Sequence, residues 1–400
     1  MMFRRAIRYS NNCFGLSRKL SGITDGRIKP RIATIKIAIA IFSMQLANLG
    51  SLNNFSQQVL SPSVSTIARS ADTMSIGDIR EVNLNIYKKA RRSKMLNPHK
   101  GRWIGVVDGK EITTSSYCKC RHCKRRKLRD KEGKLKYQYY HQFVAFILAC
   151  SDFSFTLDIE PILPGEGEKT SAYRLLKRVC KNYPKAFSLV IGDGLYLNGK
   201  IFKLLESHHK KTIAVLKEER RLLYEEAVSL SLMTGPEVYR EGATSYRVWE
   251  HTISGCWDGY GKDVRVIASE ETTTRRAHSK DGKGWEDTEE VSNWMWATNL
   301  DVSKSIGDLK NTVKVCHSRW HIENRCFKEA ADMWNVDHIY RHSANAIMVF
   351  LLFLFMAVNI FNIFRSRNLK DKKIRTKLNL IMRLKADFLS LARPLPPIPI

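Results

Sequence analysis

Apolar residues recur along the chain in patterns that predict an alternation of strands and helices. Short runs rich in branched and aromatic side chains predict buried strands, and they occupy residues 103–107, 139–150, 153–163, 187–192 and 212–216. Apolar residues at helical spacing predict helices over residues 170–182 and 198–208. This order of elements predicts an α/β fold in which helices cover a mixed sheet.

The longest apolar stretch covers residues 346–364, where Asn359 and Asn362 are the only polar side chains. A helix of this length can span a bilayer, so a membrane-anchored basic protein is one interpretation. A helix that is apolar all round suits the centre of a large globular core equally well. Because the stretch stands alone, we predict a buried helix and no membrane.

The excess of basic residues indicates which class of molecule the protein binds. Lys and Arg total 67 against 39 acidic residues, which gives a net charge of +28. Such an excess attracts polyanions and predicts binding to nucleic acid. The nine cysteines show no disulfide-like framework, and the N-terminus lacks the apolar core of a signal peptide. Both features favour a reducing, cytoplasmic location, associated with the nucleoid.

Two of the predicted strands are each followed by an Asp-Gly pair, at Asp108 and Asp193. If these strands are parallel neighbours, their backbones lie about 4.8 Å apart and the two carboxylates come together. The alternative for either aspartate alone is a turn or helix-cap role, because Asp-Gly favours turns.

A third carboxylate, Glu323, falls in a helix predicted to begin near Ser318. Its face of that helix also carries apolar residues, namely Trp320, Phe327, Ala331 and Trp334. An ionised carboxylate among apolar side chains is costly unless a cation compensates it, and a salt bridge to Arg319 is one alternative. Three carboxylates together can instead hold two Mg²⁺ or Mn²⁺ ions.

These residues carry a resemblance to a known family. Asp108 in WIGVVDGKE, Asp193 in LVIGDGLYLNG and Glu323 in HSRWHIENRCFKEA resemble the DDE triad of bacterial insertion-sequence transposases, closest to the insertion-sequence-four superfamily. The resemblance covers about residues 103–345. Arg319 fits the family signature around the glutamate, whereas Cys316 replaces its Tyr and Ala330 its Lys; Lys328 lies two positions before Ala330.

The resemblance implies a ribonuclease-H-like fold with a β-rich insertion before the catalytic Glu helix. Together with the patterns along the chain, it gives five segments: a helical, basic, DNA-end-binding region (1–97), the first part of the catalytic domain (98–221), the β-rich insertion (222–315), the Glu helix with the buried helix (316–364) and a basic tail (365–400). It also implies a metal-dependent enzyme that cleaves transposon ends at their terminal inverted repeats and transfers strands into target DNA. Pairing two ends implies a homodimer on DNA.

A basic, cysteine-bearing segment follows the first aspartate. Cys118, Cys120 and Cys123 supply part of a structural Zn²⁺ site, for which His122 or His141 is a candidate fourth ligand. Reduced cysteines in a solvated loop are the equally weighted alternative. The residues predicted to contact DNA are Lys124, Arg125, Arg126, Lys127, Lys217, Arg319 and Lys328.

Three functional alternatives remain open at this stage. One is a nuclease on the same fold that makes no joined products. Another is a catalytically decayed, transposase-derived protein that only binds DNA, favoured by the altered signature at Cys316 and Ala330. The membrane-anchored basic protein is the third.

Overall fold

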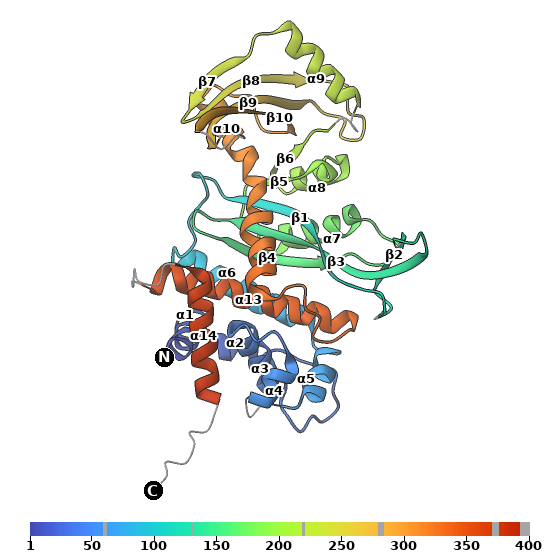
Figure 1. Cartoon of the computed structure of the whole chain (residues 1–400), viewed down its shortest axis with the longest axis vertical. Coiled ribbons are helices and arrows are strands. Elements are labelled where there is room, and N and C mark those ends of the chain that lie inside the picture. Colours follow the sequence, from blue (N-terminus) through green and yellow to red (C-terminus); the bar gives the residue numbers. More distant parts are fainter. Residues whose placement is uncertain are drawn as a thin grey trace. The chain divides into compact units, whose positions relative to one another are not determined.

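The computed structural model describes residues 1–58, 62–117, 119–129, 131–217, 221–278, 284–369 and 376–392. The chain forms two compact units, whose elements are labelled in Figure 1. Unit 1 comprises Met1–His99, Asp108–Tyr183 and His321–Ile400, and unit 2 comprises Lys100–Val107 and Pro184–Trp320. Strand β1 (Ile104–Ser115) contributes its first four residues to unit 2 and the rest to unit 1.

Unit 1 contains a sheet built around one long strand, β3 (Leu135–Ala149). Its first half pairs antiparallel with β2 (Lys124–Arg129), and its second half pairs antiparallel with β4 (Ser154–Pro161). Strand β1 is its neighbour on the other side in the strand order. Helix α7 (Glu168–Asn182) packs on β3 and β4 through its buried apolar stripe, which includes Leu175 and Val179.

The remainder of unit 1 is helical. The N-terminal helices are α1 (Met2–Phe14), α2 (Leu16–Leu20), α3 (Thr34–Leu46), α4 (Leu52–Gln58), α5 (Val64–Ala71) and α6 (Ile76–Arg92). Several of them pack around α13 (Ala344–Asn368), and α14 (Lys377–Ala392) packs against α1. The helical N-terminal region is therefore confirmed.

Helix α13 forms the centre of this unit. Within the described part of the chain it is the one helix with the length and composition to cross a membrane, and its apolar window is entirely buried inside the structure. Its polar Asn359 is fully buried and forms hydrogen bonds with the backbone of strand β4. The side chain accepts a hydrogen bond from Thr156 N at 2.9 Å and donates one to Thr156 O at 2.8 Å. The predicted buried helix is confirmed.

Unit 2 is organised around parallel strands. Residues 104–106 of β1 pair parallel with β5 (Leu189–Gly192), which pairs parallel with β6 (Lys211–Val215). The sheet continues through antiparallel strands in the order β10 (Trp285–Thr298), β9 (Val264–His278), β8 (Thr244–Ile253) and β7 (Glu237–Glu241). Its helices include α8 (Gly199–Ser207), α9 (Arg221–Met233) and α10 (Ile306–Cys316).

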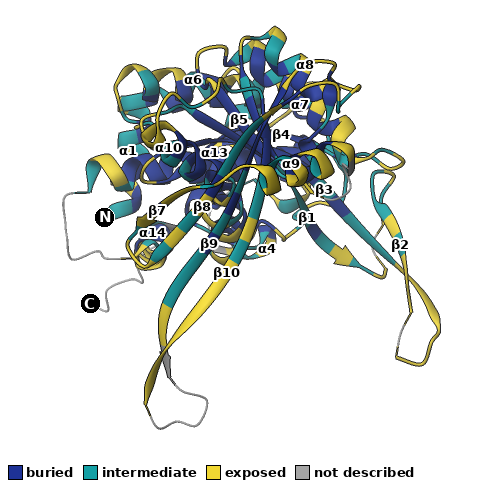
Figure 2. Ribbon diagram, turned by 90° about the horizontal axis from the view of Figure 1, so that it is seen from above, coloured by how far each residue is buried: buried dark blue, intermediate teal, exposed yellow. Residues whose placement is uncertain are grey.

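The β-rich insertion thus extends the sheet edge at β6 and does not form a separate sheet, because β10 pairs with β6 through Trp296, Ala297 and Thr298. Figure 2 shows β9 and β10 running from buried inner ends to exposed outer ends. Together the strands and helices confirm the predicted ribonuclease-H-like mixed sheet with flanking helices and a β-rich insertion.

The segment that carries Glu323 is not one regular helix. It passes through a 3₁₀ turn η3 (His317–Arg319), a short α11 (Trp320–Ile322), a π-helical turn η4 (Glu323–Phe327) and α12 (Lys328–Trp334). The predicted single apolar face is wrong at Trp320, which is 40% exposed, whereas Phe327 and Trp334 are buried. A π turn has more residues per turn than an α-helix, because its hydrogen bonds run from i to i+5, so residues on its two sides do not share the face that regular spacing predicts.

Candidate active site and metal centre

Asp108 and Asp193 each follow a residue of a parallel strand pair in unit 2. In unit 2, Val106 of β1 is paired with Ile191 of β5. Asp108 follows Val106 by two residues, and Asp193 follows Ile191 by two residues. The parallel pairing that the sequence analysis required for these two aspartates is therefore present.

Asp108 differs from the prediction in one respect, because it lies inside a strand and not at its end. Strand β1 continues from Asp108 to Ser115. The β-branched residues Ile112, Thr113 and Thr114 explain the extension, since such side chains favour strands. Strand β5, in contrast, ends at Gly192, immediately before Asp193.

One carboxylate oxygen of each aspartate organises the local backbone. Asp108 Oδ1 accepts a hydrogen bond from Gly109 N at 2.9 Å. Asp193 Oδ1 accepts one from Leu195 N at 2.8 Å and so caps the short η1 helix (Gly194–Tyr196). Asp193 therefore has the helix-cap role that was the alternative for it. This hydrogen bond orients its carboxylate at the end of β5.

The glycines that follow the aspartates each accommodate a charged side chain. In unit 1, a Cβ at Gly109 would overlap the carboxylate of Glu168, which opens α7. In unit 2, a Cβ at Gly194 would lie 3.1 Å from the stem of Lys217. Glu168 therefore places a carboxylate beside Gly109, and the stem of Lys217 lies beside Gly194.

Glu323 is the first residue of the π-helical turn and is half-buried. Within unit 1, residues on both sides of it are held against β4: Ser154 Oγ donates to His321 O at 3.5 Å, and Thr156 Oγ1 lies 3.7 Å from Cys326 Sγ. Within unit 2, the preceding turn η3 packs against β5. Glu323 follows the last residue of η3 by four positions in the sequence.

The basic residues predicted to contact DNA have different surroundings. Arg125 and Lys127 are exposed on β2, as are Lys217 and Lys328 on their own segments. Arg126 instead forms two hydrogen bonds with Glu111, at 2.8 and 2.9 Å.

The other two predicted contacts are partly engaged within the chain. Lys124 Nζ donates to Gln142 Oε1 at 3.0 Å. The Arg319 guanidinium lies over the Trp320 ring, 4.6 Å from its centroid. DNA contact by all seven of these residues stays a prediction.

Four Cys and His side chains of unit 1, which are residue types that commonly bind metal ions, form a compact cluster. Among the described residues, Cys120, Cys123, His141 and His342 are the one group of three or more His, Cys, Asp or Glu whose ligand atoms all lie within 4.8 Å of one another. Of the earlier zinc candidates, Cys118 lies outside the described residues, and the cluster includes His141 but not His122.

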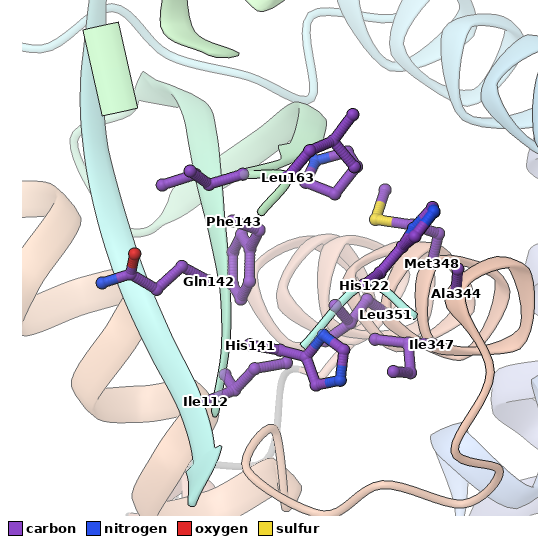
Figure 3. Close-up of a pocket in the computed structure, with 12 residues that line it drawn as sticks. Ile112, His122, His141, Gln142, Phe143, Leu163, Ala344, Ile347, Met348 and Leu351 are labelled. Atoms are coloured by element: carbon purple, nitrogen blue, oxygen red, sulfur yellow. The ribbon is translucent and has the colours of Figure 1, made fainter. Parts of the chain in front are cut away.

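His141 is the buried member of the cluster, 8% exposed. Burial, together with the neighbouring His342 and His122, lowers its pKa to about 4, so its imidazole is neutral at neutral pH. Figure 3 shows His141 and His122 lining a pocket whose other walls include Phe143 of β3 and Leu351 of α13.

Sequence reasoning missed two residues of these sites. His342 lies 201 residues after His141, so no ligand spacing could reveal it. Glu168 follows the turn that contains Glu166, and only the packing of α7 on the sheet places its carboxylate beside Gly109. Both omissions concern contacts between segments that are far apart in the sequence.

Comparison with known proteins gives one match over most of the chain. Residues 99–360 match the family model described as "Transposase DDE domain", and this range contains Asp108, Asp193 and Glu323. No curated protein sequence matches the chain. Among solved structures, the chain is similar to "Cryo-EM structure of piggyBac transposase synaptic complex with hairpin DNA (SNHP)", with a TM-score of 0.46 and 12% identity, covering 98% of this chain and 83% of that one.

Proposed function

Because the chain belongs to the family of transposase DDE domains, we propose that it cleaves DNA at transposon ends and joins the freed 3′ ends to target DNA. The observation that supports this most directly is the placement of Asp108 and Asp193. Both follow register-paired residues of parallel strands, which is the arrangement that brings two carboxylates to one site. Assignment to the insertion-sequence-four superfamily stays a prediction.

We propose Asp108, Asp193 and Glu323 as the catalytic carboxylates. The donor chemistry fits Mg²⁺ or Mn²⁺, because all three residues offer hard oxygen ligands. When bound, the ions would polarise the scissile phosphate and activate the attacking oxygen. Position 323 also suits a functional residue, since π-helical turns occur frequently at functional sites.

The surrounding residues have roles that follow from their charge and position. Lys217 is exposed and its stem lies against Gly194, the residue after Asp193, so we propose that its ammonium holds a DNA phosphate there. Arg125 and Lys127 lie exposed on one strand and can follow a phosphate backbone further along the DNA. The net charge of +28 supports binding to long DNA segments.

The partners we propose are the terminal inverted repeats of the element and its target DNA. Two transposon ends must be joined to one target, so we also propose that two copies of the chain act together on DNA.

The test is cleavage and joining of DNA that carries the flanking inverted repeats, in the presence of Mg²⁺. Asp108→Asn, Asp193→Asn and Glu323→Gln should each lower the cleavage rate about a thousandfold or more, because several kcal/mol of transition-state stabilisation is lost. Asp301→Asn is the matched control: this exposed aspartate pairs with Lys211 at 3.1 Å, and its variant should cleave normally.

The products separate this function from its alternatives. Joined donor–target molecules from the unaltered protein support the transposase, whereas cleavage without joining identifies a nuclease. DNA binding without any Mg²⁺-dependent cleavage identifies a decayed, binding-only protein. Unchanged cleavage by Asp193→Asn would contradict the proposed catalytic residues.

A further inference from the structure

Three separate segments of unit 1 bring Cys and His side chains to one point. Cys120 and Cys123 lie in a tight turn before β2, closed by a hydrogen bond of 3.0 Å from Cys123 N to Cys120 O. His141 lies in β3 next to that turn, because β3 pairs with β2 through Tyr140. His342 comes from the segment that enters α13.

The position of His342 is fixed from both sides. The preceding Arg341 pairs with Asp72 at 2.9 Å. The following Ser343 caps α13 by accepting a hydrogen bond from Ala346 N. The backbone on both sides of His342 is therefore held in place, which keeps its imidazole next to the cysteines.

The distances within the cluster match a tetrahedral zinc site. Bonds of about 2.3 Å to sulfur and about 2.0–2.1 Å to nitrogen place two sulfurs about 3.8 Å apart, a sulfur and a nitrogen about 3.6 Å apart, and two nitrogens about 3.3 Å apart. The two sulfurs are 3.8 Å apart, and His141 Nε2 is 3.6 and 3.3 Å from them. His342 Nε2 is 3.2 Å from Cys123 Sγ and 3.1 Å from His141 Nε2.

The chemistry of the ligand set selects the metal. Two sulfurs and two imidazoles in a tetrahedral arrangement are typical of Zn²⁺, whereas Mg²⁺ takes oxygen ligands. The cluster borders a pocket of about 350 Å³ that is also lined by Thr114, Tyr139 and His338, which provides a route for the ion. A Cys120–Cys123 disulfide is not the explanation, because the two sulfurs are 3.8 Å apart, whereas disulfide-bonded sulfurs lie about 2.05 Å apart.

We propose that Cys120, Cys123, His141 and His342 bind one structural Zn²⁺, which ties the start of the basic strand β2 to the entrance of α13. Four ligands fill the tetrahedral coordination shell, so the ion has a structural and not a catalytic role. The carboxylates proposed for Mg²⁺ are not part of this group. The zinc site is therefore independent of the proposed DNA chemistry.

The test measures metal bound to the purified full-length protein, without any DNA. The unaltered protein should hold about one zinc per chain. Replacement of zinc by Co²⁺ should give the intense visible bands of a tetrahedral site and a sulfur-to-cobalt charge-transfer band in the near ultraviolet. Absence of stoichiometric zinc, or a weak octahedral Co²⁺ spectrum, would overturn the proposal without the need for any variant.

Matched variants test the ligand assignment. His342→Ala and Cys123→Ser should lose most of the zinc, and protease should cut more readily in the segment before β2. His122→Ala is the control, since this histidine lies in the same turn but outside the cluster, and it should retain its zinc. Full zinc content in His342→Ala would contradict the assignment. Asp193→Asn should keep its zinc, so a failure of the catalytic proposal is recognised separately.

Discussion

The side chain of Asn359 accepts a hydrogen bond of 2.9 Å from the backbone nitrogen of Thr156, 203 residues away in the sequence. Asn359 lies on the apolar helix α13, and Thr156 lies on β4. Asn359 also donates to Asn83 Oδ1 of α6 at 3.1 Å, so one buried amide joins two helices and a strand. Asn359, one of two polar side chains in the apolar stretch of α13, is thus explained by its hydrogen bonds to the backbone of β4.

Asn359→Leu should lower the free energy of unfolding by about 2–3 kcal/mol, because Thr156 N would be buried without its partner. Chemical denaturation measures this loss. Asn362→Leu is the matched control on the same helix: Asn362 donates a long bond of 3.5 Å to Glu329, and its Oδ1 accepts none within the described structure. Its cost should stay below about 1 kcal/mol; equal costs for the two variants would argue against the role given to Asn359.

Glu166 should make stability depend on pH. Hydrogen bonds from Arg174 hold the pKa of Glu166 at about 2, below its ordinary value of 4.5. Because the folded-state pKa is depressed, the stabilisation is complete above the unfolded value and is lost as the pH falls toward 2. Glu166→Gln should therefore cost about 2 kcal/mol at pH 7 and progressively less below pH 4.5.

Urea denaturation at several pH values between 7 and 3 measures this difference. Glu237→Gln, at an exposed position on β7, is the control and should have little effect at any pH. A cost for Glu166→Gln that does not change between pH 7 and pH 3 would exclude the ion pair as its cause.

Lys217 should contribute to DNA affinity through a phosphate contact. Lys217→Ala should reduce the slope of the logarithm of the binding constant against the logarithm of salt concentration by about 1. Lys262→Ala serves for comparison, because Lys262 is also exposed but is paired with Glu206 at 2.9 Å. The binding constant for DNA that carries a transposon end is measured at several salt concentrations. Identical slopes for the two variants would show that Lys217 does not contact a DNA phosphate.

The space at Gly109 is filled by the carboxylate of Glu168. Gly109→Ala should therefore displace that carboxylate while leaving the melting temperature nearly unchanged, since the end of a flexible side chain can move. Because Gly109 directly follows the proposed catalytic Asp108, we expect this displacement to slow cleavage about tenfold. The double variant Gly109→Ala/Glu168→Ala should then cleave no more slowly than Glu168→Ala alone. If the losses of the two single variants add, the substitution at Gly109 slows cleavage independently of Glu168.

Much of the sheet could be predicted because its strands have strong local patterns. The runs before Asp108 and Asp193 predicted the two strands that pair in parallel, β1 and β5. The extension of β1 beyond Asp108 was not predicted, since an Asp-Gly pair ordinarily favours a turn. Pairing with neighbouring strands outweighed that local preference.

The parts that could not be predicted depend on tertiary contacts. The π turn at Glu323 has no sequence signature, because regular spacing of apolar residues assumes a regular helix. His342 joins the cysteine cluster only through the fold of unit 1. The sequence therefore offered Cys120 and Cys123 as candidate ligands and His141 as one of two candidates for a further ligand, and it gave no sign of His342.

The central claim is that Asp108, Asp193 and Glu323 share divalent ions, and metal-directed cleavage of the protein tests it most directly. Fe²⁺ bound in place of Mg²⁺ to the zinc-loaded protein, with ascorbate and peroxide, cuts the backbone near its ligands. We predict cuts close to positions 108, 193 and 323, all suppressed by excess Mg²⁺ and all weakened in Asp193→Asn. Cuts near the two aspartates with the segment around Glu323 left intact would contradict the account.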